Sequence, residues 1–132
     1  MLLTTACGDR PPEPAVLELG ADTITLAPGV AIVEIGIGGT EGDFEPATAT
    51  ARVGDVIRFT ARDRGSHAVV FMEAGLAAEA RAFLEDSGQL RGPPLLDPGT
   101  AWIVSMEGAP AGAYPFRCVT HGAEGHLTVE PR

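Results

Sequence analysis

Glycine and proline interrupt this chain so often that only short extended segments can form between them. Seventeen Gly and eleven Pro fall among its 132 residues, and the apolar runs between them are short. Alternation of apolar and polar residues buries one face of a strand, and frequent turn residues let strands follow one another closely. A chain of this length suits one domain with one core. The pattern predicts an all-β fold and argues against a helix bundle.

Alternation identifies the main strands, and one change of period identifies a helix. In residues 112–118, for example, Tyr114, Phe116 and Cys118 share one face. Between Leu76 and Asp86 the apolar residues instead recur at helical spacing, which predicts one short helix. Counted together, seven or eight strands predict a two-sheet Greek-key sandwich with one short inserted helix. The predicted strands are residues 15–19, 23–26, 30–37, 53–59, 66–71, 100–107, 112–118 and 126–130.

The acidic charge of the chain narrows the classes of partner. Nine basic residues, all of them Arg, stand against eighteen acidic ones and give a net charge of −9. This balance argues against nucleic acid and against charge-driven binding to anionic lipid, and it suits a basic protein partner. The loop from Glu41 to Glu45 is acidic and is expected to be solvated. Apolar runs of about 18 residues or more, which a transmembrane helix needs, do not occur in the sequence.

The first residues resemble the end of a bacterial lipoprotein signal, in which a short apolar run precedes a Cys that is lipidated. Here the run leads to Ala6 and Cys7, and a Pro-rich stretch follows, although Thr4 stands where such signals usually have Leu and the charged region is missing. We interpret residues 1–19 as a truncated signal-like start with a linker, and residues 20–132 as the folded domain. We expect a periplasmic or otherwise extracytoplasmic protein that is lipid-anchored at Cys7.

Two other interpretations of Cys7 stay open. In the first interpretation Cys7 is a free N-terminal cysteine. In the second it forms a disulfide with Cys118, which is the only other cysteine in the sequence.

The residues that carry metal chemistry gather near the C-terminus. The chain has three histidines, and two of them, His121 and His126, share one short segment with Cys118. A loop between two strands can bring such donors together, and His67 follows a polar turn at an end of the predicted sandwich. A thiolate with two imidazoles suits copper, whereas Cys with three His also suits tetrahedral zinc. We predict one copper ion with His67, Cys118, His121 and His126 as candidate ligands.

From Phe44 to Glu130 the sequence resembles the cupredoxins, the small blue copper proteins that include plastocyanin and pseudoazurin. The most specific segment is Gly-Ala-Tyr-Pro-Phe-Arg-Cys-Val-Thr-His at residues 112–121, and Ser-His-Ala-Val-Val-Phe at residues 66–71 resembles the segment of the first His ligand. The resemblance implies that His67, Cys118 and His121 are trigonal copper ligands. It also implies that Tyr114 forms a tyrosine corner.

The sequence also departs from the family pattern. Cupredoxins usually have Met as a weak axial ligand at the position held here by His126, so we expect His126 to take that role. The Cys-x2-His-x4-His spacing resembles that of nitrosocyanin, a red copper protein that has Glu where this chain has His67. Ala68 stands where many members have an Asn that links the two ligand loops, so these loops must be held together differently.

Several functions fit this pattern. We expect an electron carrier, a monomer and not an enzyme, that exchanges one electron with a redox protein partner. An imidazole in the axial place would instead suit a catalytic or small-molecule-sensing copper site of red or green type. Copper delivery or storage and a structural zinc site are further alternatives. A Cys-His nucleophile pair has the least support, because the sequence offers no oxyanion loop or substrate pocket.

Overall fold

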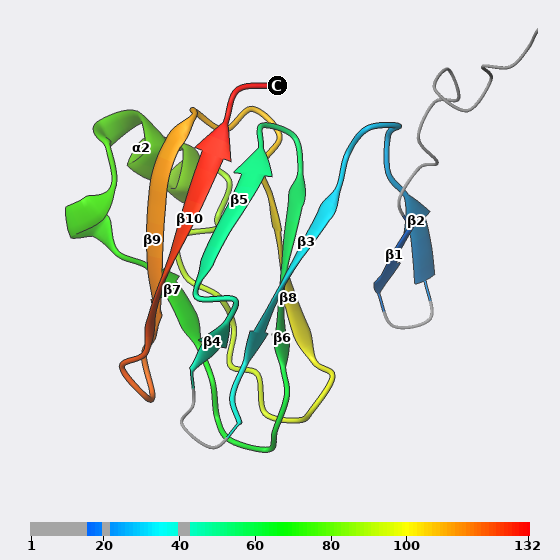
Figure 1. Cartoon of the computed structure of the whole chain (residues 1–132), viewed down its shortest axis with the longest axis vertical. Helices are drawn as coiled ribbons and strands as arrows, with labels where there is room; N and C mark the ends of the chain where they lie inside the picture. The colour runs from blue at the N-terminus through cyan, green and yellow to red at the C-terminus, as the bar shows by residue number, and fades with distance from the viewer. Residues whose placement is uncertain (1–15, 20–21, 40–42) are drawn as a thin grey trace, which may run out of the picture.

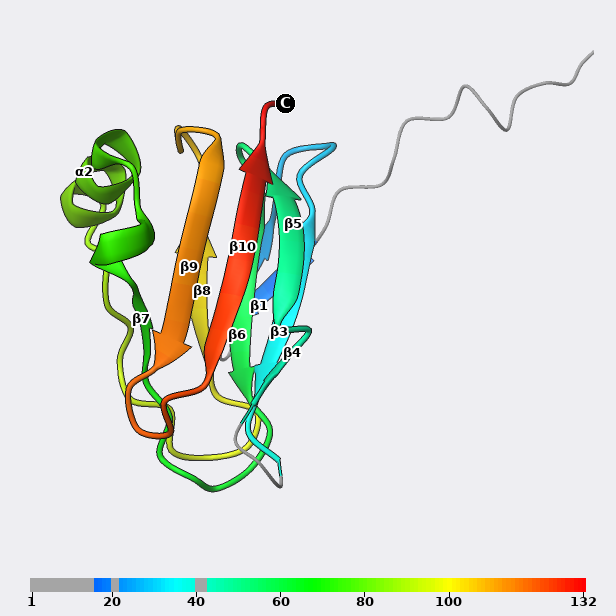
Figure 2. The same ribbon diagram turned by 60° about the vertical axis from the view of Figure 1, so that its left-hand side comes forward.

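The computed structural model describes residues 16–19, 22–39 and 43–132, and Cys7 and the predicted Pro-rich stretch lie outside this part. Eight strands form two four-stranded sheets that pack face to face (Figures 1 and 2). One sheet has the order β4-β3-β6-β8, with β4 at Phe44–Glu45, β3 at Ile32–Ile37, β6 at Val56–Ala61 and β8 at Ala101–Ser105. The other has the order β5-β10-β9-β7, with β5 at Thr48–Arg52, β10 at Glu124–Glu130, β9 at Gly112–Cys118 and β7 at Val69–Phe71.

Both sheets mix parallel and antiparallel pairs. Strand β3 runs parallel to β6, and β5 runs parallel to β10, whereas every other pair within the two sheets is antiparallel. The parallel neighbours are distant in sequence, so the chain crosses between the sheets instead of building each from consecutive hairpins. This topology confirms the predicted Greek-key sandwich.

A short hairpin precedes the sandwich. Strands β1 (Val16–Leu19) and β2 (Asp22–Thr25) pair with each other, on the side of the β3-β6 sheet that faces away from the second sheet (Figures 1 and 2). The side chain of Leu17 is buried. The hairpin spans the boundary predicted between residues 19 and 20, and that boundary stays a prediction.

The predicted helix is confirmed and lies beyond the end of β7, beside β9 (Figures 1 and 2). A 3-10 helix, η1, covers Glu73–Gly75, and the α-helix α2 covers Ala78–Asp86. Ala80 and Leu84 of α2 are buried. No helix in the described part of the chain is long and apolar enough to cross a membrane.

Aromatic side chains from both sheets form the centre of the core. The ring of Phe116 in β9 lies edge-on to Phe44 at a centroid distance of 4.7 Å and to Phe59 at 5.1 Å. Such edge-to-face pairs add a specific attraction to the burial of apolar surface. Cys118 continues the same inward-facing row of β9 beyond Phe116, so the core leads directly to the predicted metal ligand.

Several strands differ from expectation, and β4 at Phe44–Glu45 lies within the loop that was expected from Glu41 to Glu45. Strand β5 was not predicted, because its inward residues are only Ala49 and Ala51. Strand β10 begins at Glu124, two residues before the predicted start at His126. The extra pairs join Glu124 to Arg117 and Gly125 to Phe116, so the preceding loop is shorter than predicted.

Tyr114 supplies a polar contact at the edge of the core. Its ring is fully buried, and its hydroxyl donates a hydrogen bond of 2.6 Å to the carbonyl oxygen of Pro110. Burial raises the pKa of Tyr114 to about 12, so the hydroxyl stays protonated as a donor. This local bond has the form of the predicted tyrosine corner.

We predict that Tyr114→Phe lowers the free energy of unfolding by about 1–2 kcal/mol, because the Pro110 carbonyl loses its partner while the ring still packs. Urea unfolding followed by circular dichroism measures the change. A loss below about 0.5 kcal/mol, as for an average surface substitution, would contradict this role.

Candidate metal centre

The register between β7 and β9 places Cys118 at the end of the core. Cys118 is the last residue of β9, its side chain is fully buried, and it pairs with Val69 of β7. Immediately beyond, the backbone N–H of Val119 donates to the carbonyl oxygen of Ala68 at 2.8 Å. This backbone bond joins the two ligand-bearing segments without the Asn that many cupredoxins have.

His67 is held from the other side by the loop of residues 92–99. The N–H of His67 donates to the Leu95 carbonyl at 3.0 Å, and the N–H of Leu95 donates to the His67 carbonyl at 2.7 Å. Only 1% of the His67 surface is exposed. The backbone on both sides therefore fixes where the His67 ring enters the core.

His121 stands on a tight loop, residues 119–123, between β9 and β10. The N–H of Gly122 donates to the Cys118 carbonyl, and the N–H of Cys118 donates to the Ala123 carbonyl, each at 2.8 Å. These bonds fold the loop back over the end of β9 and return His121 toward the sulfur. In contrast to His67, His121 is exposed to solvent.

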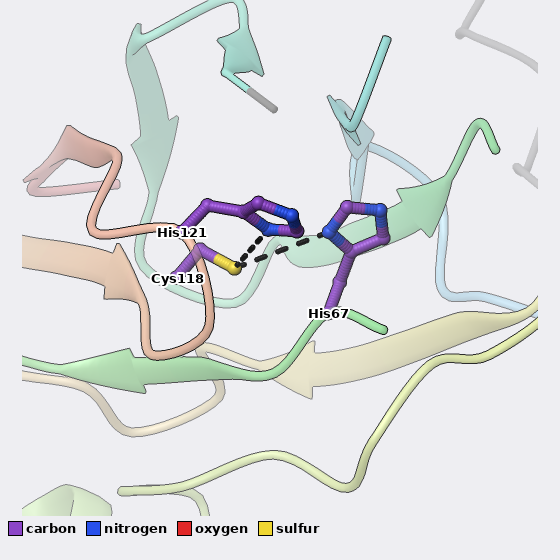
Figure 3. A group of neighbouring side chains, drawn as sticks. All are labelled: His67, Cys118 and His121. Atoms are coloured by element: carbon purple, nitrogen blue, oxygen red, sulfur yellow. Dashed lines mark hydrogen bonds between the residues drawn. The ribbon is translucent and has the colours of Figure 1, made fainter. Parts of the chain in front are cut away.

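The three side chains meet at one point, where the Cys118 sulfur faces one nitrogen of each imidazole (Figure 3). The sulfur lies 3.6 Å from Nδ1 of His121 and 4.0 Å from Nδ1 of His67. The donor atoms lie within 4.8 Å of one another. Metal bonds of about 2.0 Å to nitrogen and about 2.3 Å to sulfur, meeting at about 110–120°, separate the two atoms by about 3.5–3.7 Å. The donors therefore fit a single metal ion.

A scan of protein-family models and a search of curated proteins find no match to this sequence. Solved structures do match. Plastocyanin of the fern Dryopteris crassirhizoma has a TM-score of 0.58 and 23% identity, and covers 74% of this chain and 100% of its own. Amicyanin of Paracoccus versutus has a TM-score of 0.56 and 19% identity, and the match covers 79% of this chain and 85% of amicyanin. A purple cupredoxin of Nitrosopumilus maritimus has a TM-score of 0.55 and 21% identity, and the match covers 74% of this chain and 99% of that cupredoxin.

The chain has the cupredoxin fold. Within this fold His67, Cys118 and His121 lie at the end of the sandwich where the loops after β6 and β9 meet (Figure 2).

The fourth candidate, His126, lies apart from this cluster. It is exposed in β10, next to the buried Leu127, and it pairs with Pro115 of β9. Because Leu127 and Tyr114 form the next, inward-facing pair, His126 and Pro115 face outward. The N–H of His126 donates to the Ala47 carbonyl at 2.7 Å, which fixes it as a strand residue. The axial role predicted for His126 is therefore not supported by its position.

One contributor to the site was missed in the sequence. Asp63 belongs to the polar turn before His67, and its Oδ1 lies 2.6 Å from Nε2 of His67. The hydrogen bond from His67, followed by those from the N–H groups of Gly39 and Gly65, lowers the pKa of Asp63 to about 2. The available signal was its position four residues before a candidate ligand, which also suits an ordinary solvated turn.

The surroundings of Cys118 favour its thiolate. Burial raises the pKa of this thiol, but hydrogen bonds from the His121 ring and from the backbone of Ala68 and His121 outweigh burial and lower the pKa from 9.0 to about 6. A thiolate is the form that binds a metal ion. The site thus presents a charged sulfur donor at neutral pH.

We predict that the thiol of the metal-free protein titrates near pH 6 instead of near pH 9. The measurement follows the ultraviolet absorbance of the thiolate in a Cys7→Ser background, so that Cys118 is the only thiol. His121→Ala should raise the midpoint, because it removes a hydrogen bond to the sulfur. A midpoint near pH 9 in the protein that still has His121 would show that the imidazoles do not stabilise the thiolate.

Proposed function

We propose that this chain is a mononuclear copper protein that carries one electron between protein partners outside the cytoplasm. The observation that carries the proposal is the buried Cys118 sulfur facing Nδ1 of both His67 and His121. A soft thiolate with two imidazoles is the donor set of blue copper electron-transfer sites. A copper ion held here would supply a one-electron Cu(II)/Cu(I) couple.

The chain's own residues suit electron transfer because they hold the donors in fixed places. Cys118 ends a paired strand, and His67 is bonded through its backbone to Leu95. A site that changes little between oxidation states has a small reorganisation cost, and rigid donors limit that change. His121 is the exposed donor, so a partner that docks on this loop reaches the site through its ring.

A redox protein is the proposed partner, with a basic docking surface. The net charge of −9 supports this choice, since opposite charges accelerate association. Val119, beside the exposed ligand, and Leu96, next to Leu95, are large apolar residues that are 48% and 55% exposed. They offer apolar contact area at the same end of the sandwich. We further propose that the protein acts as a monomer.

Loading with copper should produce a strong thiolate-to-copper absorption band, and Cys118→Ser should abolish it while the sandwich still folds. The serine hydroxyl fits the space but provides no soft thiolate. Visible absorption and EPR spectra with a titration of bound copper measure the colour and the stoichiometry, for which we expect one ion. Colour that persists in Cys118→Ser would refute the assignment.

His126→Ala is the matched control, because it removes an imidazole from the outer face of the same sheet. We expect its copper spectrum to equal that of the unaltered protein. A copper spectrum of His126→Ala that differs from that of the unaltered protein would show that His126 is a ligand. A colourless purified protein with one tightly bound zinc, which copper does not replace, would instead favour a structural zinc site.

For location, we propose lipid attachment at Cys7, on the basis of the apolar run and the Pro-rich stretch around it. Expressed from its gene with the native upstream sequence, the protein should fractionate with membranes, and Cys7→Ser should move it to the soluble fraction. Cys118→Ser serves as the control, since it changes a thiol that the lipid would not use. An unchanged distribution of Cys7→Ser would exclude the anchor.

A further inference from the structure

We propose that Asp63 is a positioning residue that fixes the orientation of His67 and, by its charge, favours the oxidised form of the centre. The proposal rests on the proposed copper function and concerns the regulation of its potential.

The Asp63 carboxylate is held on both oxygens by two different segments. Its Oδ2 accepts the N–H of Gly39, after β3, at 2.7 Å, and its Oδ1 accepts the N–H of Gly65 at 2.9 Å. Oδ1 also lies 2.6 Å from Nε2 of His67. The carboxylate thus joins the chain after β3 to the turn after β6 and presents a fixed oxygen to the ring.

Two glycines make room for this contact. A Cβ atom at Gly38, whose φ is +120°, would lie 2.8 Å from Oδ2 of Asp63. A Cβ atom at Gly65 would lie 3.1 Å from Oδ1 of Asp63 and 3.2 Å from Nε2 of His67. A side chain at Gly38 would collide with the Asp63 carboxylate, and one at Gly65 would fit only if Asp63 and His67 shifted by a few tenths of an ångström.

The contact determines how His67 presents its two nitrogens. Because a carboxylate accepts hydrogen bonds, the neutral ring carries its proton on Nε2 and leaves the Nδ1 lone pair toward Cys118. A ring flip would break the bond to Asp63. The negative charge lies behind the ligand, and it stabilises the ion of higher charge more than the ion of lower charge. Asp63 should therefore tighten Cu(II) binding relative to Cu(I).

Two variants separate these effects. Asp63→Asn keeps an oxygen that can accept from Nε2 and removes the charge, whereas Asp63→Ala removes both. Asp97→Asn is the control, because it removes the same charge from the exposed loop of residues 92–99. Nitrogen-15 NMR of the His67 ring in the metal-free protein reports the position and protection of the ring proton. Voltammetry of the copper-loaded protein reports the relative affinity for the two oxidation states.

We expect the unaltered protein to show a protected proton on Nε2 of His67, which Asp63→Ala loses and Asp63→Asn keeps. Asp63→Asn should raise the affinity for Cu(I) relative to Cu(II) about tenfold, which corresponds to a rise of about 59 mV in the one-electron reduction potential. Asp97→Asn should change this ratio much less. An unchanged Nε2 proton in Asp63→Ala, or equal shifts in Asp63→Asn and Asp97→Asn, would overturn the proposal. If copper does not bind at all, the proposed function fails while the metal-free NMR measurement still decides the positioning role.

Discussion

The pairing of β7 with β9 is the constraint on which the site depends. It places Cys118 opposite Val69, two residues after His67, and the Val119–Ala68 backbone bond continues the pairing beyond the strand ends. The sulfur and the His67 ring thus meet because two backbones are in register, before any metal binds. The loop of residues 119–123 then has to return only one further donor, His121. A slip of one residue in this register would turn Cys118 to the outer face and separate the donors.

A polar cluster at the end of an apolar core is costly to bury unless its atoms are paired. The pairing comes from outside the core, because Asp63 bonds the outer nitrogen of His67 and the ring of His121 bonds the sulfur. In the described part of the chain no buried side-chain nitrogen or oxygen lacks a partner. The same contacts that offset desolvation also orient the donors, so the fold and the site are stabilised by shared interactions.

The sequence predicted the features that depend on local spacing and missed those that depend on distant contacts. Strands such as β3, β6 and β9 alternate large apolar residues and were predicted from that pattern, whereas β5 faces the core with Ala49 and Ala51 alone. Spacing also identified His67, Cys118 and His121 as a group. The placement of His126 depends on the register of β10, which is fixed by the pairing with β9 from Glu124 onward and by the bond from the His126 N–H to the Ala47 carbonyl. Asp63 acquires its partner only when the turn after β6 folds back on His67.

Under the proposed electron-transfer function, the two imidazoles would meet opposite demands, which accounts for their different surroundings. A donor that keeps the geometry constant must be shielded and braced, and His67 is buried, bonded through its backbone to Leu95 and through its ring to Asp63. A donor that passes electrons to a partner must reach the surface, and His121 is exposed on a short loop. One side chain cannot be both enclosed and accessible. Placing one histidine before a strand and the other on a loop lets the centre stay rigid while one edge of it remains open to solvent.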